Sequence, residues 1–454
     1  MRLALELAFA RSAGRLSRLA GRGGGTTLPG KILATIDPSA LSTLAARLPR
    51  GTAVVSATNG KTTTASLAAA ILSPRIRLAH NRAGANLVSG VTSTLIDARR
   101  AELGLFEVDE GAFPDIARRI RPRVVCLGNL FRDQLDRYGE LEAIAERWRA
   151  AVAELPEGAA LVANADDPQV GSLASIRPES VTYGLDDPLQ ARPSLQHAAD
   201  SKYCLRCGTP YAYTAAYVGH LGDYHCPACG HGRPSLDLAA RAIELHGLDA
   251  VSFDLVTPEE TRRVQVALPG LYNVYNALAA AALARALGAT PDEIAAGLAG
   301  AQPAFGRAER IDVEDRTVLI LTIKNPTGAN EVVRTLVAAG APKVAMIALN
   351  DRVADGRDVS WIWDADFEPL LDRLERLVVT GGRAAELALR CTYAGFPPDR
   401  LEIVPEVGAA LDCGLELTAA GGELTVLPTY TAMLALRKIV SDRGHSRQYW
   451  ERAA

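Results

Sequence analysis

The stretch that most constrains the fold runs from Val54 to Leu72 and reads VVSATNGKTTTASLAAAIL. An apolar strand enters a tight Asn-Gly turn, and an alanine-rich helix follows directly. In α/β proteins this arrangement holds polyphosphate, because free N–H groups and the positive end of the helix dipole face the anion. The sequence therefore predicts a nucleotide site at the carboxyl end of a strand.

The Gly60-Lys61-Thr62 turn supplies the side chains that such a site needs. We expect Lys61 to reach the β- and γ-phosphates of ATP as a point charge, and Thr62 to place its hydroxyl on Mg²⁺. A full P-loop also has a glycine where this chain has Val55. A surface turn with a solvated lysine is the alternative. The expected ATP-binding residues of this loop are Thr58, Asn59, Gly60, Lys61, Thr62 and Thr63.

Length and composition fit a large enzyme. A chain of 454 residues is too long for one core and predicts about two or three domains. The net charge of −3 indicates neither a nucleic-acid partner nor an acidic coat. Because no apolar run approaches the roughly 20 residues that span a bilayer, we expect no transmembrane segment.

The N-terminus, residues 1–30, reads as a basic amphipathic helix and linker. The pattern predicts two faces, an apolar one with Leu5, Phe9, Leu16 and Leu19 and a basic one with Arg11, Arg15 and Arg18. Packing against the body of the protein and contact with an anionic membrane surface both explain this pattern.

Four of the seven cysteines form two Cys-x-x-Cys knuckles. They are Cys204, Cys207, Cys226 and Cys229. Two knuckles at this spacing place four thiolates around one Zn²⁺, and with no open position the site is expected to be structural. Two disulfides are the alternative, but Cys126, Cys391 and Cys413 look like isolated thiols of a reducing cytoplasm. The ribbon interior has aromatics and few cations, so we expect no nucleic acid to bind there.

Short β-rich runs alternate with helical runs from residue 31 to 302, which predicts a parallel sheet covered by helices. The ribbon, residues 198–236, is inserted in this domain, and residues 303–310 resemble a hinge. A smaller α/β domain is expected over residues 308–454. The expected strands are Thr52–Ser56, Leu103–Val108, Val124–Leu127 and Ala160–Ala163, then Val318–Ile323, Val344–Leu349, Arg376–Thr380 and Glu423–Leu427.

Glu107 ends one of these apolar runs, where ligands bind in open α/β sheets. A carboxylate there can hold a metal ion that bridges phosphate and substrate. Asp109 and Glu110 compete for this role, and a solvated acidic turn is the further alternative. Asn273 and Asn276 lie three residues apart at the start of an expected helix, where ordinary capping is the simplest explanation.

The variant loop Thr58-Asn59-Gly60-Lys61-Thr62 resembles the phosphate loop of the Mur ligases, ATP-dependent enzymes that join amino acids to cell-wall precursors. The resemblance implies the family's central P-loop domain with its parallel sheet. It also implies Mg²⁺ on Glu107, adenine contacts from Asn273 and Asn276, and a hinge arginine at Arg307 near the nucleotide. Two departures are Ala57, where the family usually has glycine, and Gln134, which replaces a histidine ligand of the second metal.

Because the phosphate loop begins near residue 55, we expect the chain to lack the N-terminal domain that binds the uridine nucleotide in most Mur ligases. The segments 322–330 and 350–364, together with the four-cysteine insertion, resemble the MurT subunits of this family. These subunits imply ATP-dependent amidation of the α-carboxylate of D-glutamate in lipid II, with ammonia from a GatD glutamine amidotransferase subunit. No glutaminase nucleophile is evident in the chain. Work at the cytoplasmic face of the membrane is implied.

The resemblance to MurT subunits also implies that the acid supporting the partner's glutaminase histidine comes from the C-terminal domain of this chain. Among the aspartates between Asp351 and Asp364, Asp355 is the first choice as this catalytic residue and Asp358 the second; capping of its own turn is the alternative for Asp355. A partner-independent ligase resembling Mur ligases or folylpolyglutamate synthase is the alternative function. A nucleotide-binding scaffold, with the ribbon docking another macromolecule, is a third hypothesis.

Overall fold

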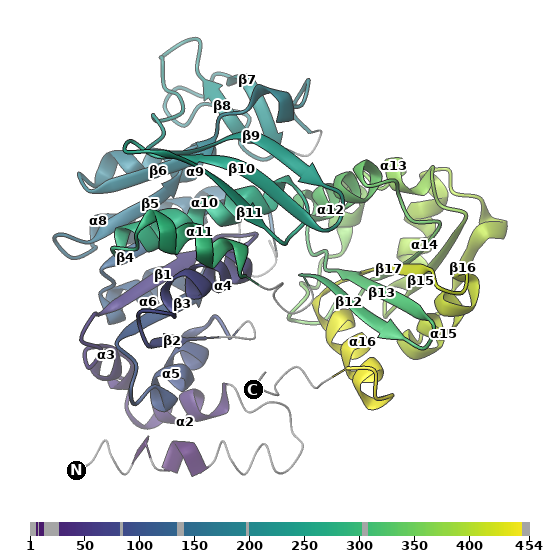
Figure 1. Cartoon of the computed structure of the whole chain (residues 1–454), viewed down its shortest axis with the longest axis horizontal. Coiled ribbons are helices and arrows are strands. Elements are labelled where there is room, and N and C mark those ends of the chain that lie inside the picture. The colour runs from purple at the N-terminus through teal and green to yellow at the C-terminus, as the bar shows by residue number, and fades with distance from the viewer. Residues whose placement is uncertain are drawn as a thin grey trace.

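The computed structural model describes residues 6–7, 9–12, 27–81, 85–133, 140–196, 199–301 and 307–446, with only the backbone of residue 307. A nine-stranded sheet organises the first part of the chain, in the order β11-β10-β9-β6-β5-β4-β1-β3-β2 (Figure 1). Its strands are β1 (Thr52–Ser56), β2 (Leu78–His80), β3 (Leu103–Val108), β4 (Val124–Leu127), β5 (Ala160–Asn164), β6 (Ser180–Leu185), β9 (Leu238–His246), β10 (Ala250–Val256) and β11 (Thr261–Val266).

The strands from β2 to β9 pair in parallel, as the sequence predicts. At the other edge, β10 pairs antiparallel with both β9 and β11, so the sheet is mixed there. The reason is local: short turns connect β9, β10 and β11, whereas parallel strands need a longer crossover.

Helices cover both faces of the sheet, because successive strand residues point to opposite sides. On one face Val55 and Leu105 contact the core formed by α4, α10 and α11. On the other face Val54 and Phe106 contact the core formed by the remaining helices. The helices are α2 (Leu28–Ile36), α3 (Ala40–Ala45), α4 (Lys61–Leu72), α5 (Val88–Asp97), α6 (Phe113–Ile120), α8 (Leu141–Ala153), α9 (Pro168–Gly171), α10 (Leu271–Ala286) and α11 (Pro291–Ala299).

Residues 6–7 and 9–12 are helical and pack on the second core through Leu7 and Ala10. Phe9 is 60% exposed, so the apolar face expected from Leu5, Phe9, Leu16 and Leu19 was wrong at Phe9. The other three leucines lie outside the described residues, as do Arg15 and Arg18. Arg11 donates to the carbonyl of Ile96, which ties this segment to the body of the protein.

The ribbon is a two-stranded hairpin of β7 (Ala212–Val218) and β8 (Leu221–His225), inserted between β6 and β9. In Figure 1 it lies above the central sheet. No helix in the described part of the chain has the length and apolar character that crossing a bilayer requires.

A second, six-stranded sheet has the order β12-β13-β17-β14-β15-β16 and is parallel except for β12. Its strands are β12 (Arg307–Val313), β13 (Arg316–Leu321), β14 (Val344–Ala348), β15 (Arg376–Thr380), β16 (Leu401–Ile403) and β17 (Glu423–Pro428). Its helices are α12 (Pro326–Ala338), α13 (Glu368–Leu371), α14 (Ala384–Tyr393), α15 (Val407–Leu417) and α16 (Tyr430–Asp442). Residues 307–310, expected in a hinge, begin β12, while residues 302–306 lie outside the described residues.

Candidate functional site

The turn between β1 and α4 has the backbone of a phosphate loop. Gly60 has φ +85°, which favours glycine, and it precedes the first residue of α4. A Cβ at this position would lie 2.0 Å from Oδ1 of Asn276. The helix start and α10 therefore approach so closely here that only glycine fits.

Lys61 is buried and points back along its own loop. Its Nζ lies 2.7 Å from Oε2 of Glu110 and also donates to the carbonyls of Ala57 and Thr58. Burial works against the charged form, but the carboxylates of Glu110 and its neighbours outweigh it and raise the pKa of Lys61. The ammonium group therefore stays charged beside the loop, and its ion-pair partner in this structure is Glu110.

Thr62 and Glu107 come together at the carboxyl ends of β1 and β3. The hydroxyl of Thr62 donates to Oε1 of Glu107 at 3.0 Å. The backbone of Glu107 is fixed by the side chain of Asn81, which bonds to its N–H at 2.8 Å and its carbonyl at 2.7 Å. A hydroxyl and a carboxylate are hard oxygen donors, so this pair fits Mg²⁺.

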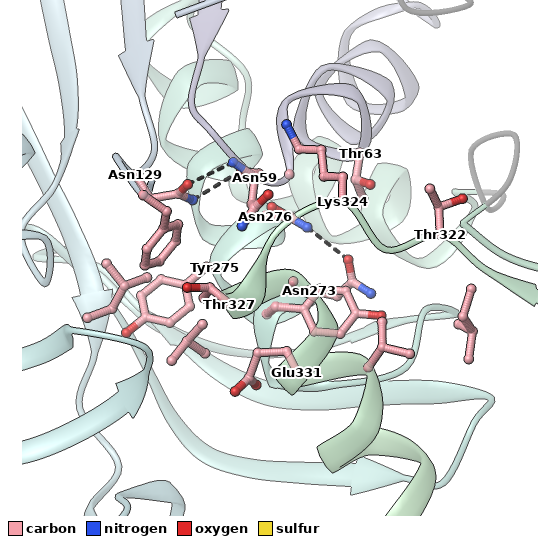
Figure 2. A pocket seen from close by; sticks show the side chains of 18 of the residues that line it. Asn59, Thr63, Asn129, Asn273, Tyr275, Asn276, Thr322, Lys324, Thr327 and Glu331 are labelled. Atoms are coloured by element: carbon pink, nitrogen blue, oxygen red, sulfur yellow. Dashed lines mark hydrogen bonds between the residues drawn. The ribbon is translucent and has the colours of Figure 1, made fainter. Parts of the chain in front are cut away.

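Asparagine side chains tie the phosphate loop to its neighbours. Asn129, after β4, accepts from the N–H of Asn59 at 2.9 Å and donates to its carbonyl at 3.0 Å (Figure 2). Thr58 accepts from the N–H of Phe131 at 3.1 Å. Thr58 therefore organises the loop after β4 with its hydroxyl, whereas Thr63 lines the adjacent cavity.

That cavity lies where the central sheet, the ribbon and the C-terminal domain meet. Asn273 and Asn276 form part of its wall, and the amide of Asn276 donates to Oδ1 of Asn273 at 2.9 Å (Figure 2). The other lining residues are Asn59, Gly60, Thr63, Asn129, Phe131, Val218, Leu221, Tyr272, Tyr275, Ala308, Leu321, Thr322, Lys324, Thr327, Gly328, Glu331 and Val332. The structure thus brings the predicted loop and the predicted Asn-x-x-Asn pair to one cavity.

Two residues of this site were missed by the sequence analysis. Lys324 lines the cavity and pairs with Asp133, and Asn325 bonds to the side chain of Asn59. The signal was present, because Asn325 followed by Pro326 is the typical start of a helix. A helix start directly after a lysine that follows a strand could have been recognised as a second anion-facing element.

Two predicted positions lie at or beyond the limit of the described residues. The backbone of Arg307 begins β12 opposite Leu321, which lines the cavity, and its side chain is not described. Gln134 lies outside the described residues.

The four ribbon cysteines form one cluster. Their Sγ atoms all lie within 4.8 Å of one another, and the Cys204–Cys229 and Cys207–Cys226 sulfurs are 3.5 and 3.4 Å apart. All four are unbridged, so the disulfide alternative does not hold. Four convergent, unbridged sulfurs fit a structural Zn²⁺.

Asp355 is turned into the C-terminal domain. Its oxygens accept from the N–H of Thr431 at 2.7 Å, from the Thr431 hydroxyl at 2.5 Å and from the N–H of Arg352 at 3.2 Å. Asp358 is exposed, and the hydrogen bond that it accepts from the N–H of Ser360 lowers the pKa of Asp358. Of the two candidates, Asp358 is the more accessible.

Two protein-family models match the chain: the Mur ligase middle domain over residues 55–220 and the MurT ligase C-terminal domain over residues 322–433. The chain is 33% identical to the lipid II isoglutaminyl synthase (glutamine-hydrolyzing) subunit MurT of Streptococcus pneumoniae, over 94% of each chain. It is 34% identical to the subunit of that name from Staphylococcus aureus, over 87% of this chain and 88% of the relative.

Solved structures show the same fold. A pseudomurein peptide ligase type C from Methanothermus fervidus matches with a TM-score of 0.70 and 21% identity, over 88% of this chain and 80% of that one. The MurF ligase of Thermotoga maritima in complex with ADP matches with a TM-score of 0.64 and 15% identity, over 90% and 85%.

Proposed function

The chain belongs to the MurT group of the Mur ligase family, and from that premise we propose that it is the ligase subunit of a lipid II isoglutaminyl synthase. Its reaction is ATP-dependent amidation of the α-carboxylate of D-glutamate in the lipid II stem peptide. The ammonia comes from a GatD-like glutamine amidotransferase subunit. The amidation takes place at the inner face of the membrane.

The chemistry proceeds in two steps. A carboxylate is a poor electrophile, so one of its oxygens first takes the γ-phosphoryl group of ATP, which gives an acyl phosphate and ADP. The ammonia nitrogen then attacks the carbonyl carbon, phosphate leaves, a proton is lost and D-isoglutamine is formed.

The observation that carries the proposal is the pair Thr62–Glu107 beside the phosphate loop. These two side chains would hold Mg²⁺, which when bound neutralises charge on the phosphates. The N–H groups at the start of α4 would face the same anion, and Lys61, which pairs with Glu110 in the structure, would exchange that carboxylate for a phosphate oxygen. Asn273 and Asn276 are proposed to contact adenine, and Arg307 to approach the nucleotide from β12.

A separate glutaminase subunit is supported by the cysteines outside the ribbon. Burial raises the pKa of Cys391 to about 12, and it also raises the pKa of Cys126 and of Cys413. Such thiols are poor nucleophiles at neutral pH, since the thiolate is the reactive form. We propose that Asp355, or in second place Asp358, supports the histidine of the partner's glutaminase site.

The test is reconstitution with the amidotransferase subunit, lipid II, ATP and either glutamine or an ammonium salt. The expected product is a stem peptide in which one carboxyl group has become an amide, measured by mass spectrometry, with ADP formed in equal amount. A gain in mass equal to a whole amino-acid residue, without the partner, would instead support a partner-independent ligase. No ATP consumption with lipid II and ammonia present would support the scaffold hypothesis.

A further inference from the structure

The end of the ribbon hairpin that is farthest from the cysteines forms part of the nucleotide cavity. Val218, the last residue of β7, and Leu221, the first of β8, both line the cavity and are both buried. If the ribbon served only to stabilise its own fold, its turn would not need to line the cavity.

Gly219, in this turn, has φ +59° and sits between two other parts of the site. A Cβ at Gly219 would lie 2.9 Å from Cε1 of Phe131, in the loop after β4, and 3.2 Å from Cγ2 of Thr327, on α12. The turn therefore fills the space between the central domain and the C-terminal domain at the wall of the cavity.

His220 connects the hairpin turn to the loop after β4. That loop is in turn hydrogen-bonded to the phosphate loop. His220 is completely buried, with Nε2 3.3 Å from Oδ2 of Asp167 and its ring centroid 4.8 Å from that of Phe131. The same Oδ2 accepts from the N–H of Leu130 at 2.8 Å. Leu130 follows Asn129, whose side chain bonds to Asn59 in both directions.

The hairpin is also held by the C-terminal domain. Arg334, on α12, donates to the carbonyl of Tyr217 in β7 at 2.9 Å. Arg192 donates to the same carbonyl at 3.3 Å and to Oε1 of Glu331, on α12, at 2.6 Å.

The other end of the hairpin is the cysteine cluster, because Cys226 directly follows the last residue of β8. After this knuckle the chain returns to the cavity through Arg233, which donates to Asp166 at 3.0 Å. Asp166 in turn accepts from the hydroxyl of Tyr275, a cavity residue of α10, at 2.6 Å. Two short routes thus connect the cysteines to the cavity wall.

We propose that the zinc ribbon is a working part of the nucleotide site: its turn at residues 218–221 shapes the cavity wall, so that zinc occupancy and ATP affinity are coupled. The inference rests on the proposed function, since it takes the cavity to be the ATP site. Coupling of this kind is reciprocal, so bound ATP must also retain zinc.

The first experiment compares two glycine variants of the full chain. Gly219→Ala and Gly247→Ala introduce the same left-handed strain, at φ +59° and +58°, but an added Cβ has no neighbour within 4 Å at Gly247. We expect zinc content near one ion per chain in both, and a dissociation constant for ATP, measured by calorimetry with Mg²⁺ present, that rises roughly tenfold only in Gly219→Ala. Equal ATP affinity in both variants would overturn the inference.

The second experiment needs no variant. The rate of zinc release to a chromogenic chelator is measured for the wild-type chain with and without a non-hydrolysable ATP analogue, in excess Mg²⁺. Slower release with the analogue is expected, and an unchanged rate would overturn the coupling even if Gly219→Ala failed to fold. Absence of ATP binding to the wild-type chain would overturn the proposed function as well, whereas wild-type binding without coupling overturns this inference alone.

Discussion

The side-chain amides of Asn59 and Asn325 bond to each other in both directions. Nδ2 of Asn59 lies 3.2 Å from Oδ1 of Asn325, and Nδ2 of Asn325 lies 3.0 Å from Oδ1 of Asn59. Asn59 belongs to the phosphate loop, and Asn325 is the N-cap of α12 in the C-terminal domain. This pair therefore links the phosphate loop directly to the C-terminal domain.

We expect Asn325→Asp to raise the KM for ATP roughly tenfold with little change in stability. The carboxylate still accepts from the N–H of Gly328, as the N-cap does at 2.9 Å, so α12 remains capped. However, it cannot donate to Asn59, and it adds a negative charge beside the phosphates. Steady-state kinetics at several ATP concentrations, with thermal unfolding as the control, measure both effects; an unchanged KM would contradict the proposed link.

Replacing Lys61 by alanine is expected to lower amidation by roughly 10²-fold or more, because one electrostatic contact to the transferring phosphoryl group is lost. The same change leaves Glu110 buried without its partner, so some loss of stability is also expected. The double variant Lys61→Ala, Glu110→Gln removes that buried charge. It should recover stability without recovering activity, and retention of more than about a tenth of wild-type activity in either variant would refute the phosphate-loop assignment.

Glu107→Gln is expected to increase the Mg²⁺ concentration needed for half-maximal rate, since a neutral amide is a weaker ligand than a carboxylate. The matched variant is Glu110→Gln, at the neighbouring carboxylate that pairs with Lys61 instead of Thr62. Titration of Mg²⁺ at saturating ATP distinguishes the two. A larger shift in Glu110→Gln would move the metal site from Glu107 to Glu110.

Much of this site was predictable because local sequence determines it. A strand, a tight turn and a helix with Gly60-Lys61-Thr62 fix the phosphate loop, and Glu107 follows from the end of an apolar run. The cysteine spacing likewise predicts a cluster that the folded chain brings together.

Contacts between distant segments were not predictable. The positions of Asn59 and Asn325 in the sequence do not indicate that these residues, 266 positions apart, share two hydrogen bonds. The same holds for Phe9, which helical spacing places on an apolar face, whereas tertiary packing buries Leu7 and Ala10 instead. For Asp355 the sequence shows an exposed-looking turn, but the start of α16 takes up its carboxylate.

The ribbon is expected to bind about one Zn²⁺ per chain, and to lose it when Cys204 and Cys226 are both replaced by serine. Because metal binding and local folding are coupled, the double variant should unfold at a lower temperature, although no residue of the phosphate loop has been replaced. Metal analysis of freshly purified protein and thermal unfolding measure the two effects. Absence of zinc from the wild-type chain would contradict the assignment.

The last prediction concerns the aspartates that follow β14. If Asp355 supports the partner's glutaminase histidine, Asp355→Asn must lower glutamine-dependent amidation strongly and leave the reaction with ammonium salt nearly unchanged. Asp355 is only 6% exposed and bonds to Thr431, so a structural effect needs its own control. Thr431→Val removes the hydroxyl that bonds to Asp355 and keeps the carboxylate; it should retain both reactions if the carboxylate itself acts. Asp358→Asn, at the exposed position, tests the second choice in the same pair of assays. Equal loss with both nitrogen sources would place Asp355 in the ligase site or the fold, and a glutamine-specific loss in Asp358→Asn alone would transfer the role to Asp358.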